Sequence, residues 1–402
     1  MAGSWMIYGA NGYTGKLAAE LARGRGLTPI LAGRSRDKVE PLGKGLDLPT
    51  RVFSLDDAGA TRTALADVDA VLHCAGPYSA TARPMVDACL ATQTHYLDIT
   101  GEIGVFEDIH RRSDEAQSAG VCLLPGVGFD VIPTDCLAAM LAERLPDATH
   151  LELAFFGIGS ASQGTTKTMV EGLPAGGCIR RDGRITTVPP GYRTREVPFH
   201  DRPRHVVSVP WGDVSTAYYS TGIPNITAYM VLPPAMVRTT RLAGKLGWLF
   251  ARRPVQWGLK RLVELTVQGP DEQARHTSRC EVWGEVRNPI GKRVAGTLPG
   301  PLVRTSWRPW TESSFTSSGP TDGAARGARL RDPAPCPPML LRPSPGGRCP
   351  PMRPGCRPPS RGSDHCSPQQ SRRPARRRSG TRSGSRDGPA YAAPGPPRCR
   401  PR

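Results

Sequence analysis

The sequence predicts an α/β protein with three parts. These are a domain with a parallel sheet at 1–145, a second α+β domain with a mainly antiparallel sheet at 146–303, and a disordered tail at 304–402. Over the first part, short apolar segments alternate with helix-forming segments. Over the second part, strand-like segments succeed one another, and the third part is rich in Arg and Pro.

Six predicted strands alternate with helices in the first part. The strands are short and fully apolar, which is typical of a parallel sheet covered on both faces. We expect the strands at Trp5–Tyr8, Pro29–Ala32, Arg51–Ser54, Ala70–Cys74, His95–Ile99 and Val121–Leu124. We expect the helices at Thr14–Arg23, Asp37–Gly43, Ala58–Ala66, Ala82–Ala91, Val105–Ser118 and Val131–Leu145.

A glycine-rich turn joins the first strand to the first helix. In a turn that binds a dinucleotide, one glycine makes the bend, a second lets the backbone approach the pyrophosphate, and a third lets the helix pack closely. The helix N-terminus adds unpaired N–H groups and a partial positive charge. The first part is therefore predicted to be a Rossmann-type domain. Its predicted cofactor-binding turn is Gly9, Ala10, Asn11, Gly12, Tyr13, Thr14 and Gly15.

The end of the second strand indicates which cofactor binds. An NAD-binding domain usually has a carboxylate about 20 residues after the glycines, on the ribose 2′-OH. This chain has Arg34 and Ser35 there, and a guanidinium suits a 2′-phosphate, so we predict NADP. The small residues after the fourth strand would let backbone lie against the cofactor. They are Cys74, Ala75, Gly76 and Pro77.

The loops that follow the fourth, fifth and sixth strands carry the candidate catalytic residues. Ligands bind at the carboxyl ends of parallel strands, so Tyr78, Asp98 and Glu102 are candidate proton donors or orienting groups. Tyr78 has a structural role as an equal alternative. Asp130 follows the sixth strand on the same side, and for this residue we favour a helix-capping role.

The second part predicts an antiparallel sheet. We expect strands at Leu151–Phe156, Val206–Val209, Val214–Tyr219 and Ile226–Leu232, and a short helix at Thr165–Leu173. A polar stretch, Ile179 to Arg204, contains the turn Arg181-Asp182-Gly183. A hairpin is expected from Thr277–Val286 and Arg293–Thr297, around the turn Asn288-Pro289-Ile290-Gly291.

The segment 236–265 predicts a basic helix broken near Pro254. Trp248, Trp257 and several leucines lie among its charges, so the segment fits either contact with a membrane surface or a helix packed on a sheet. It is too charged and too interrupted to span a bilayer. Its basic residues are Arg238, Arg241, Lys245, Arg252, Arg253, Lys260 and Arg261.

The tail carries most of the net charge of +18. Residues 304–402 have 20 Arg, no Lys and 5 acidic residues, whereas the rest of the chain has a net charge of only +3. Two explanations fit this composition: a basic arm for nucleic acid or anionic membrane, or out-of-frame translation of a GC-rich gene. We favour the frame error, and we do not expect nucleic acid as a partner.

The cysteines favour a reduced, cytoplasmic protein. Cys74, Cys89, Cys122, Cys136, Cys178 and Cys280 are scattered, without a CxxC pair or a secretory signal. We expect no metal site, because Cys349, Cys356, His365 and Cys366 match no zinc-binding spacing. Association with the inner membrane through the 236–265 segment is the expected exception to a purely cytoplasmic location. The oligomeric state is left open.

Several motifs together resemble the saccharopine dehydrogenase-like oxidoreductases, and most of all the bacterial branch with trans-acting enoyl reductases. They are the glycine turn, Leu31-Ala32-Gly33-Arg34-Ser35, Ala75-Gly76-Pro77-Tyr78, Tyr96 to Glu102, Gly126 to Asp135, Val209 to Val214 and Ser220 to Asn225. The resemblance covers residues 4–300. It implies hydride chemistry with NAD(P)H and a substrate of the acyl or polyketide type. Members of this branch continue with an ordered C-terminal segment, and nothing after Leu302 is similar to it.

Two functions are therefore weighed. The first is an NADP-dependent oxidoreductase that reduces a double bond in complex lipid or polyketide synthesis. The second is a non-catalytic protein that keeps the cofactor-binding fold and acts at a lipid surface through the basic helix.

Overall fold

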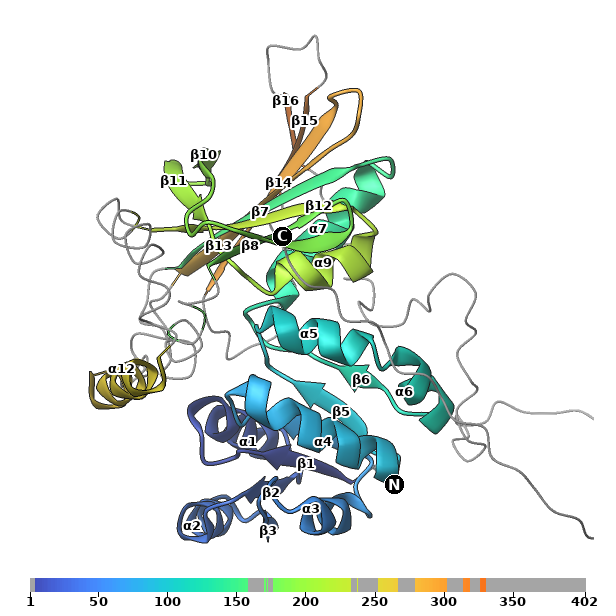
Figure 1. Cartoon of the computed structure of the whole chain (residues 1–402), viewed down its shortest axis with the longest axis vertical. Helices are drawn as coiled ribbons and strands as arrows, with labels where there is room; N and C mark the ends of the chain where they lie inside the picture. Colours follow the sequence, from blue (N-terminus) through green and yellow to red (C-terminus); the bar gives the residue numbers. More distant parts are fainter. Residues whose placement is uncertain are drawn as a thin grey trace, which may run out of the picture. The chain divides into compact units, whose positions relative to one another are not determined.

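The computed structural model describes residues 4–157, 170, 172, 176–232, 237, 252–266, 279–301, 314–318 and 326–329 of the chain. The expected helix Thr165–Leu173, most of the segment 236–252 and most of the tail lie outside the described residues. Within the described part, the strands form two sheets (Figure 1).

The first sheet is parallel and has the strand order β3-β2-β1-β4-β5-β6. In this order the chain direction across the sheet reverses between β1 and β4, which is where dinucleotides bind. Each strand lies within two residues of its predicted position, so the Rossmann-type fold is confirmed. The strands are β1 Trp5–Tyr8, β2 Ile30–Gly33, β3 Thr50–Val52, β4 Ala70–His73, β5 His95–Asp98 and β6 Leu123–Leu124.

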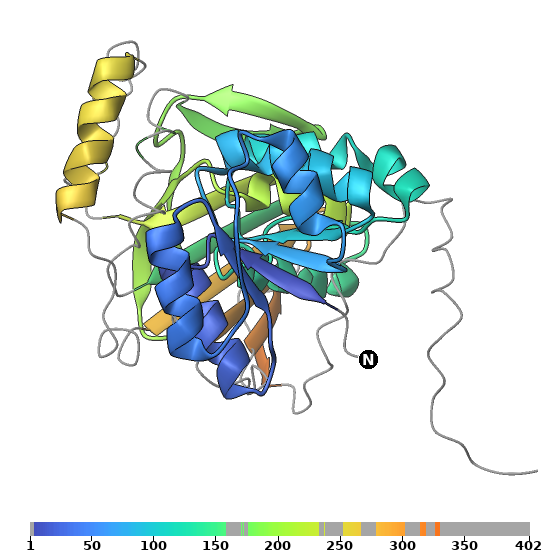
Figure 2. The same ribbon diagram turned by 90° about the horizontal axis from the view of Figure 1, so that it is seen from below.

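Helices pack on both faces of this sheet (Figures 1 and 2). One face has a core with Ile7, Ala19 and Leu31, and the other has a larger core with Met85 and Tyr96. Burial of both faces explains why the central strands β1 and β2 are almost entirely apolar. These helices are α1 Tyr13–Gly24, α2 Arg36–Leu46, α3 Ala58–Leu65, α4 Tyr78–Thr92, α5 Ile103–His110 and α6 Ser113–Ala119. The next helix, α7 Ile132–Arg144, packs on the second sheet instead.

Two helices differ from the sequence prediction. Helix α4 begins at Tyr78, four residues before the predicted Ala82, because the N–H groups of Tyr78 and Ser79 are bound by Glu102. The predicted helix Val105–Ser118 is two helices, α5 and α6, which are separated at Arg111 and Arg112.

The second sheet is mixed and mainly antiparallel, as predicted. Its strand order is β10-β11-β12-β7-β13-β14-β15-β16, with the β8–β9 hairpin attached to β12. Strand β12 runs parallel to β7, and the other described pairs are antiparallel. The strands are β7 His150–Gly157, β8 Gly177–Arg181, β9 Arg184–Val188, β10 Thr194–Pro198, β11 Pro203–Ser208, β12 Asn225–Val231, β13 Arg279–Arg287, β14 Arg293–Pro301, β15 Ser314–Ser318 and β16 Arg326–Arg329.

Helix α7 covers one face of the second sheet. Leu137 and Leu141 pack against Val282 and Val286 of β13. The helix lies so close to the strand that a Cβ atom on Gly284 would be 2.7 Å from the Leu141 Cδ1 atom. The other face of β13 has Trp283, which packs with Phe199 and Val197 and is 2% exposed. Alternation along the strand therefore separates two cores.

The predicted strand Val214–Tyr219 is wrong, because these residues belong to helix α9, Asp213–Thr221. Valine, threonine and tyrosine favour strands in isolation, but packing of α9 against α7 decides the local structure. The buried face of α9 is formed by Asp213, Val214, Ser215 and Ala217.

The polar stretch at 179–204 contains more strand than expected. The predicted turn is confirmed: Asp182 and Gly183 both have positive φ angles, of 49° and 76°, and join β8 to β9. The strands β8, β9 and β10 were not predicted. The arginines in these strands obscure the alternation of apolar and polar residues that marks a strand, although the Arg180 side chain is buried and only 3% exposed.

Helix α12, Arg253–Thr266, begins beside Pro254, where the sequence predicted a break. Proline fits the first turn of a helix because the first N–H groups have no intrahelical partner. In the predicted tail, the described residues include strands β15 and β16, which extend the second sheet beyond β14. The edge of β14 offers backbone groups with which β15 pairs, and β16 pairs with β15 in turn.

Candidate functional site

The glycine turn forms the predicted link between β1 and α1. Gly9 has a φ angle of +81°, and its N–H donates to the Ala32 carbonyl of β2 at 2.8 Å. A Cβ atom on Gly9 would lie 2.8 Å from the backbone nitrogen of Ala75. The turn therefore lies directly against the loop after β4, and only glycine fits its first position.

The N-terminus of α1 is suited to an anion. Its first turn contains no acidic residue, and no side chain caps it at Gly12. A Cβ atom on Gly15 would collide with the carbonyl oxygen of Gly9, so the third glycine allows the helix to approach the strand. The positive end of the helix dipole then lies next to the glycine turn.

The end of β2 lies next to this turn. The Asn11 Oδ1 atom is 3.2 Å from the place of a Cβ atom on Gly33, which connects the turn to the position of the predicted ribose contact. Arg34 is exposed, and Ser35 is the N-cap residue of α2. The two positions directly after β2 therefore have a basic, exposed side chain and no carboxylate, as a 2′-phosphate requires.

The loop after β4 has the small residues predicted to contact the cofactor. Ala75 touches Gly9, and Gly76 and Pro77 are exposed. Burial raises the pKa of the Cys74 thiol to about 12, with a smaller effect from Asp98, so the thiol is uncharged at neutral pH. The structure therefore brings Gly9, Ala75 and the start of α1 together. Their binding of the cofactor stays a prediction.

Asp98 anchors the loops after β5 and β6. Its Oδ2 atom accepts the Tyr96 hydroxyl at 2.6 Å, and its Oδ1 atom accepts the N–H groups of Thr100 at 2.9 Å and Gly126 at 2.8 Å. The side chain is fully buried. Burial raises the pKa of Asp98 to about 6, although these hydrogen bonds lower it. Both oxygen atoms are thus engaged in holding the two loops.

The other two candidate catalytic residues also make structural contacts. Tyr78 donates from its hydroxyl to the His73 carbonyl at 3.2 Å, and burial raises its pKa above the ordinary value. Glu102 accepts the N–H groups of Tyr78 at 2.9 Å and Ser79 at 2.8 Å, which caps α4. The catalytic roles of Tyr78, Asp98 and Glu102 stay predictions.

Asp130 lies where the loops after β5 and β6 meet α9. One of its carboxylate oxygens is 4.0 Å from the place of a Cβ atom on Gly101. The Trp211 indole donates to the Asp130 carbonyl at 2.7 Å and packs on Phe155 of β7. The expected cap is wrong in its details, because the N-cap of α7 is Val131, with no side-chain cap bond.

An ion pair joins α5 of the first sheet to β8 of the second. Arg180 bonds Glu107 and also donates to the carbonyl groups of Val214 at 2.8 Å and Gly183 at 2.7 Å. Ser215 and Tyr219 donate to the same carboxylate at 2.7 and 3.0 Å. Burial alone would raise the pKa of Glu107, but these partners lower it below the ordinary value.

Two more carboxyl groups are fully buried where α7 and α9 pack together. Asp135 accepts the Ser220 hydroxyl at 2.5 Å, and burial raises its pKa to about 6. Neither oxygen of Asp213 makes a well-aligned hydrogen bond within the described residues. Burial raises the pKa of Asp213 well above the ordinary value, Thr134 partly opposes this rise, and Asp135 adds to it.

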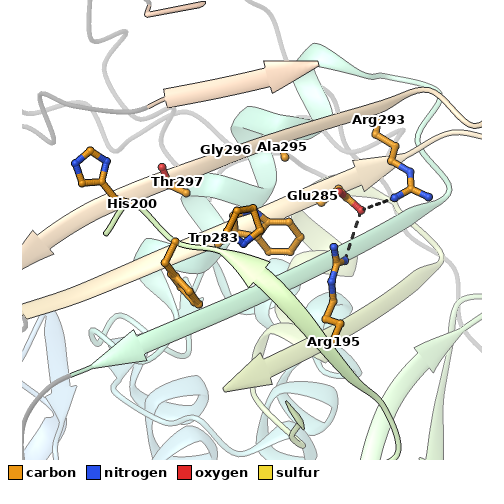
Figure 3. A pocket seen from close by; sticks show the side chains of 10 residues that line it. Arg195, His200, Trp283, Glu285, Arg293, Ala295, Gly296 and Thr297 are labelled. Atoms are coloured by element: carbon orange, nitrogen blue, oxygen red, sulfur yellow. Dashed lines mark ion pairs between the residues drawn. The ribbon is translucent and has the colours of Figure 1, made fainter. Parts of the chain in front are cut away.

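A separate pocket of about 360 Å³ lies on the second sheet (Figure 3). Arg195 and Arg293 both point to Glu285, with N–O distances of 3.5 and 3.6 Å, and Arg195 also bonds Glu152. These charges neutralise one another, so the pocket is an ion-pair cluster rather than an anion site. It contains none of the predicted site residues.

The described residues include no group of His, Cys, Asp or Glu that could hold a metal ion. None of the six cysteines in the described part forms a disulfide bond. Among the helices described, none has the length and apolar character needed to cross a bilayer.

The strand order and the glycine turn define a dinucleotide-binding domain. Residues 5–124 match the family model of the saccharopine dehydrogenase NADP-binding domain. The resemblance to saccharopine dehydrogenase-like oxidoreductases is therefore confirmed over this part of the chain.

Curated relatives agree with this assignment. The chain is 32% identical over 150 residues to a trans-acting enoyl reductase of Mycobacterium leprae, across 35% of each chain. It is 29% identical over 199 residues to a trans-acting enoyl reductase of Mycobacterium tuberculosis, across 46% of this chain and 48% of the relative. The matches thus span less than half of these relatives. A saccharopine dehydrogenase of Saccharomyces cerevisiae is similar in structure over 79% of this chain and 85% of its own, with 11% identity and a TM-score of 0.48.

Substitution of Gly15 tests whether the glycine turn binds the phosphates of the cofactor. We expect Gly15→Ala to weaken NADPH binding by about tenfold or more, because α1 must move away from the Gly9 carbonyl. Gly24→Ala is the matched control in the same helix, where a Cβ atom meets nothing within 4 Å. The control should bind NADPH normally and gain up to about 1 kcal/mol of stability. Equal NADPH affinities of the two variants in a fluorescence titration would contradict a phosphate-binding site at the glycine turn.

Asp213→Asn tests the buried carboxyl of α9. A raised pKa means that Asp213 stabilises the folded state below the pKa of the unfolded chain and loses this contribution as pH rises toward its folded pKa. Asparagine does not titrate, so the variant should gain in thermal midpoint relative to the wild type between pH 5 and pH 8. Each unit of pKa shift corresponds to about 1.4 kcal/mol. If the difference in thermal midpoint between the two proteins does not change with pH, Asp213 does not have a raised pKa in the folded state.

Proposed function

We propose that the protein is an NADPH-dependent oxidoreductase that reduces a carbon–carbon double bond in an acyl or polyketide-type substrate. The observation that carries this proposal is the glycine turn at the start of α1, together with exposed Arg34 and the lack of a carboxylate at positions 34 and 35. The names of the curated relatives support reduction of an enoyl group.

The residues of the turn fit the phosphates of the cofactor. Gly9, Gly12 and Gly15 leave room for backbone contact, and Arg34 would bind the 2′-phosphate. By the two-fold arrangement of such domains, the nicotinamide half extends from the turn to the other side of the reversal point, over β4, β5 and β6. When bound, NADPH supplies a hydride.

The loops over β5 and β6 would then surround the reacting group of the substrate. Asp98 holds both loops, and Glu102 fixes the start of α4 beside them. Phe129 and Ile132 are 40% and 39% exposed at the same place, and they offer an apolar surface to an acyl chain. We assign Asp98 and Glu102 to orienting these loops.

Reduction of a carbon–carbon double bond can be tested directly with the full chain. Absorbance at 340 nm should fall when NADPH is mixed with an enoyl thioester, and mass spectrometry should find a product two hydrogens heavier. A saturated thioester of the same length is the control and should leave NADPH unchanged. Turnover of the control, or no turnover of any enoyl thioester by a protein that binds NADPH, would contradict double-bond reduction.

Arg34→Asp tests the choice of cofactor. The introduced carboxylate would repel the 2′-phosphate and suit a ribose 2′-OH, so NADPH affinity should fall by about a hundredfold while NADH affinity is kept. Arg36→Asp, an exposed change two residues away, is the control and should alter the ratio far less. An equal loss of both cofactors in Arg34→Asp would contradict the 2′-phosphate contact.

Docking on a lipid surface is the second candidate function, and helix α12 favours it. Trp257, Leu262 and Leu265 are 72%, 55% and 68% exposed, whereas Val263 is 8% exposed. The exposed apolar residues lie on one side of the helix, and the segment 236–265 has seven basic residues and a single acidic one. This combination suits the interface of an anionic bilayer.

Vesicle co-sedimentation separates this function from an ordinary packed helix. Wild-type protein should bind vesicles that contain phosphatidylglycerol and not pure phosphatidylcholine. Trp257→Ala should reduce the partition by about tenfold, because an indole leaves the interface. Ile290→Ala, at a residue that is 74% exposed in the β13–β14 turn, is the control. Equal binding by both variants, or none by the wild type, would rule out α12 as the docking surface.

A further inference from the structure

The proposed reduction needs a proton as well as a hydride. A hydride added to the β-carbon of an enoyl thioester moves an electron pair to the carbonyl oxygen, and the α-carbon of the resulting enolate must then be protonated. Such a proton comes from a group with a free O–H or N–H within reach of the substrate. The three residues that sequence analysis suggested are engaged otherwise.

Tyr78 has its hydroxyl directed to the His73 carbonyl and is 8% exposed. Asp98 is fully buried, and three donors occupy its two oxygens. Glu102 accepts two N–H groups of α4. None of the three can give up a proton without loss of a contact that holds the loops in place.

Asp130 is different in each of these respects. Among the described residues, no side chain or N–H group bonds to its carboxyl, which is half-buried beside Gly101. It follows β6, the last strand on the side where the nicotinamide half is expected. Exposed Phe129 and Ile132 flank it, so a carboxyl group lies within an apolar surface that suits an acyl chain.

The second sheet fixes the backbone at this residue. Trp211, next to α9, donates to the Asp130 carbonyl at 2.7 Å, and its ring packs on Phe155 at 4.5 Å. The titratable groups that face Asp130 are Asp213 of α9 and the Cys280 thiol of β13. Asp213 is buried, and burial with nearby carboxylates raises the pKa of Cys280 to about 12, so within the part of the chain that the structure describes no cation offsets a charge on Asp130.

We infer that the carboxyl group of Asp130 is the proton donor for the reduction, held in place by Trp211. This inference rests on the proposed function. The β-carbon gains the hydride as the C–H bond of the reduced nicotinamide breaks, and the α-carbon gains the carboxyl proton as the Asp130 O–H bond breaks. The cofactor is oxidised, the double bond is reduced, and the Asp130 carboxylate regains a proton from water.

The state of the carboxyl is tested without turnover. Burial raises the pKa of Asp130 to about 6. Carbon-13 NMR of the aspartate carboxyl groups, on cofactor-free protein, should therefore show a resonance that titrates near pH 6 and is missing in Asp130→Asn. A midpoint near 4, the ordinary value for aspartate, would overturn the inference.

The role in proton transfer is tested with the same variant. Asp130→Asn should lower kcat for an enoyl thioester by about 10²- to 10⁴-fold and leave NADPH affinity and KM unchanged. The wild-type rate should fall above pH 6 as the carboxyl ionises, and this limb should vanish in the variant. Asp130→Glu should recover part of the rate. Asp114→Asn, in the first turn of α6, is the control.

Failure of the two proposals can be told apart. If the wild type reduces enoyl thioesters and Asp130→Asn does so at the same rate, Asp130 is not the donor and the proposed function stands. If the wild type binds NADPH without reducing any enoyl thioester, the proposed function fails, and the inference fails with it.

Discussion

The site depends on one partly buried ion pair, Glu107 with Arg180. Arg180 is 3% exposed, and its guanidinium bonds a carboxylate and two carbonyl groups while it packs over the Tyr218 ring. Charges removed from water contribute little net stability but strongly favour one geometry, since misalignment leaves a buried charge unpaired. The pair fixes α9 against α5, and this places the Trp211 indole on the loop that carries Asp130.

The carboxyl groups near the site have different roles: some hold the backbone in place, and one is available for proton transfer. Asp98 and Glu102 use their oxygens to hold backbone N–H groups, and they thereby shape the loops after β5 and the start of α4. The Asp130 carboxyl holds no backbone N–H group within the described residues, and exposed Phe129 and Ile132 flank it. Hydrogen bonding thus determines which carboxyl group is free to exchange a proton, although burial raises the pKa of Asp98 and Asp130 alike.

Local patterns made the first sheet and the glycine turn predictable. Apolar strands and glycines at fixed spacing act within about fifteen residues, so the sequence reveals them directly. The helix α9 was missed because Val214, Tyr218 and Tyr219 favour a strand, and packing on α7 overrides that preference. Asp130 was assigned to a cap because its partner, Trp211, lies 81 residues away and only the fold brings the two together.

Hydrogen exchange with and without NADPH tests this account most directly. The account predicts that NADPH protects the amides of the glycine turn, 9–15, and of the loops at 74–77, 99–102 and 125–131, with slower exchange at the start of α9. The ion-pair cluster around Glu285 on the second sheet should exchange as before. Protection confined to β13 and β14, or no protection in the loops after β5 and β6, would contradict the placement of the site.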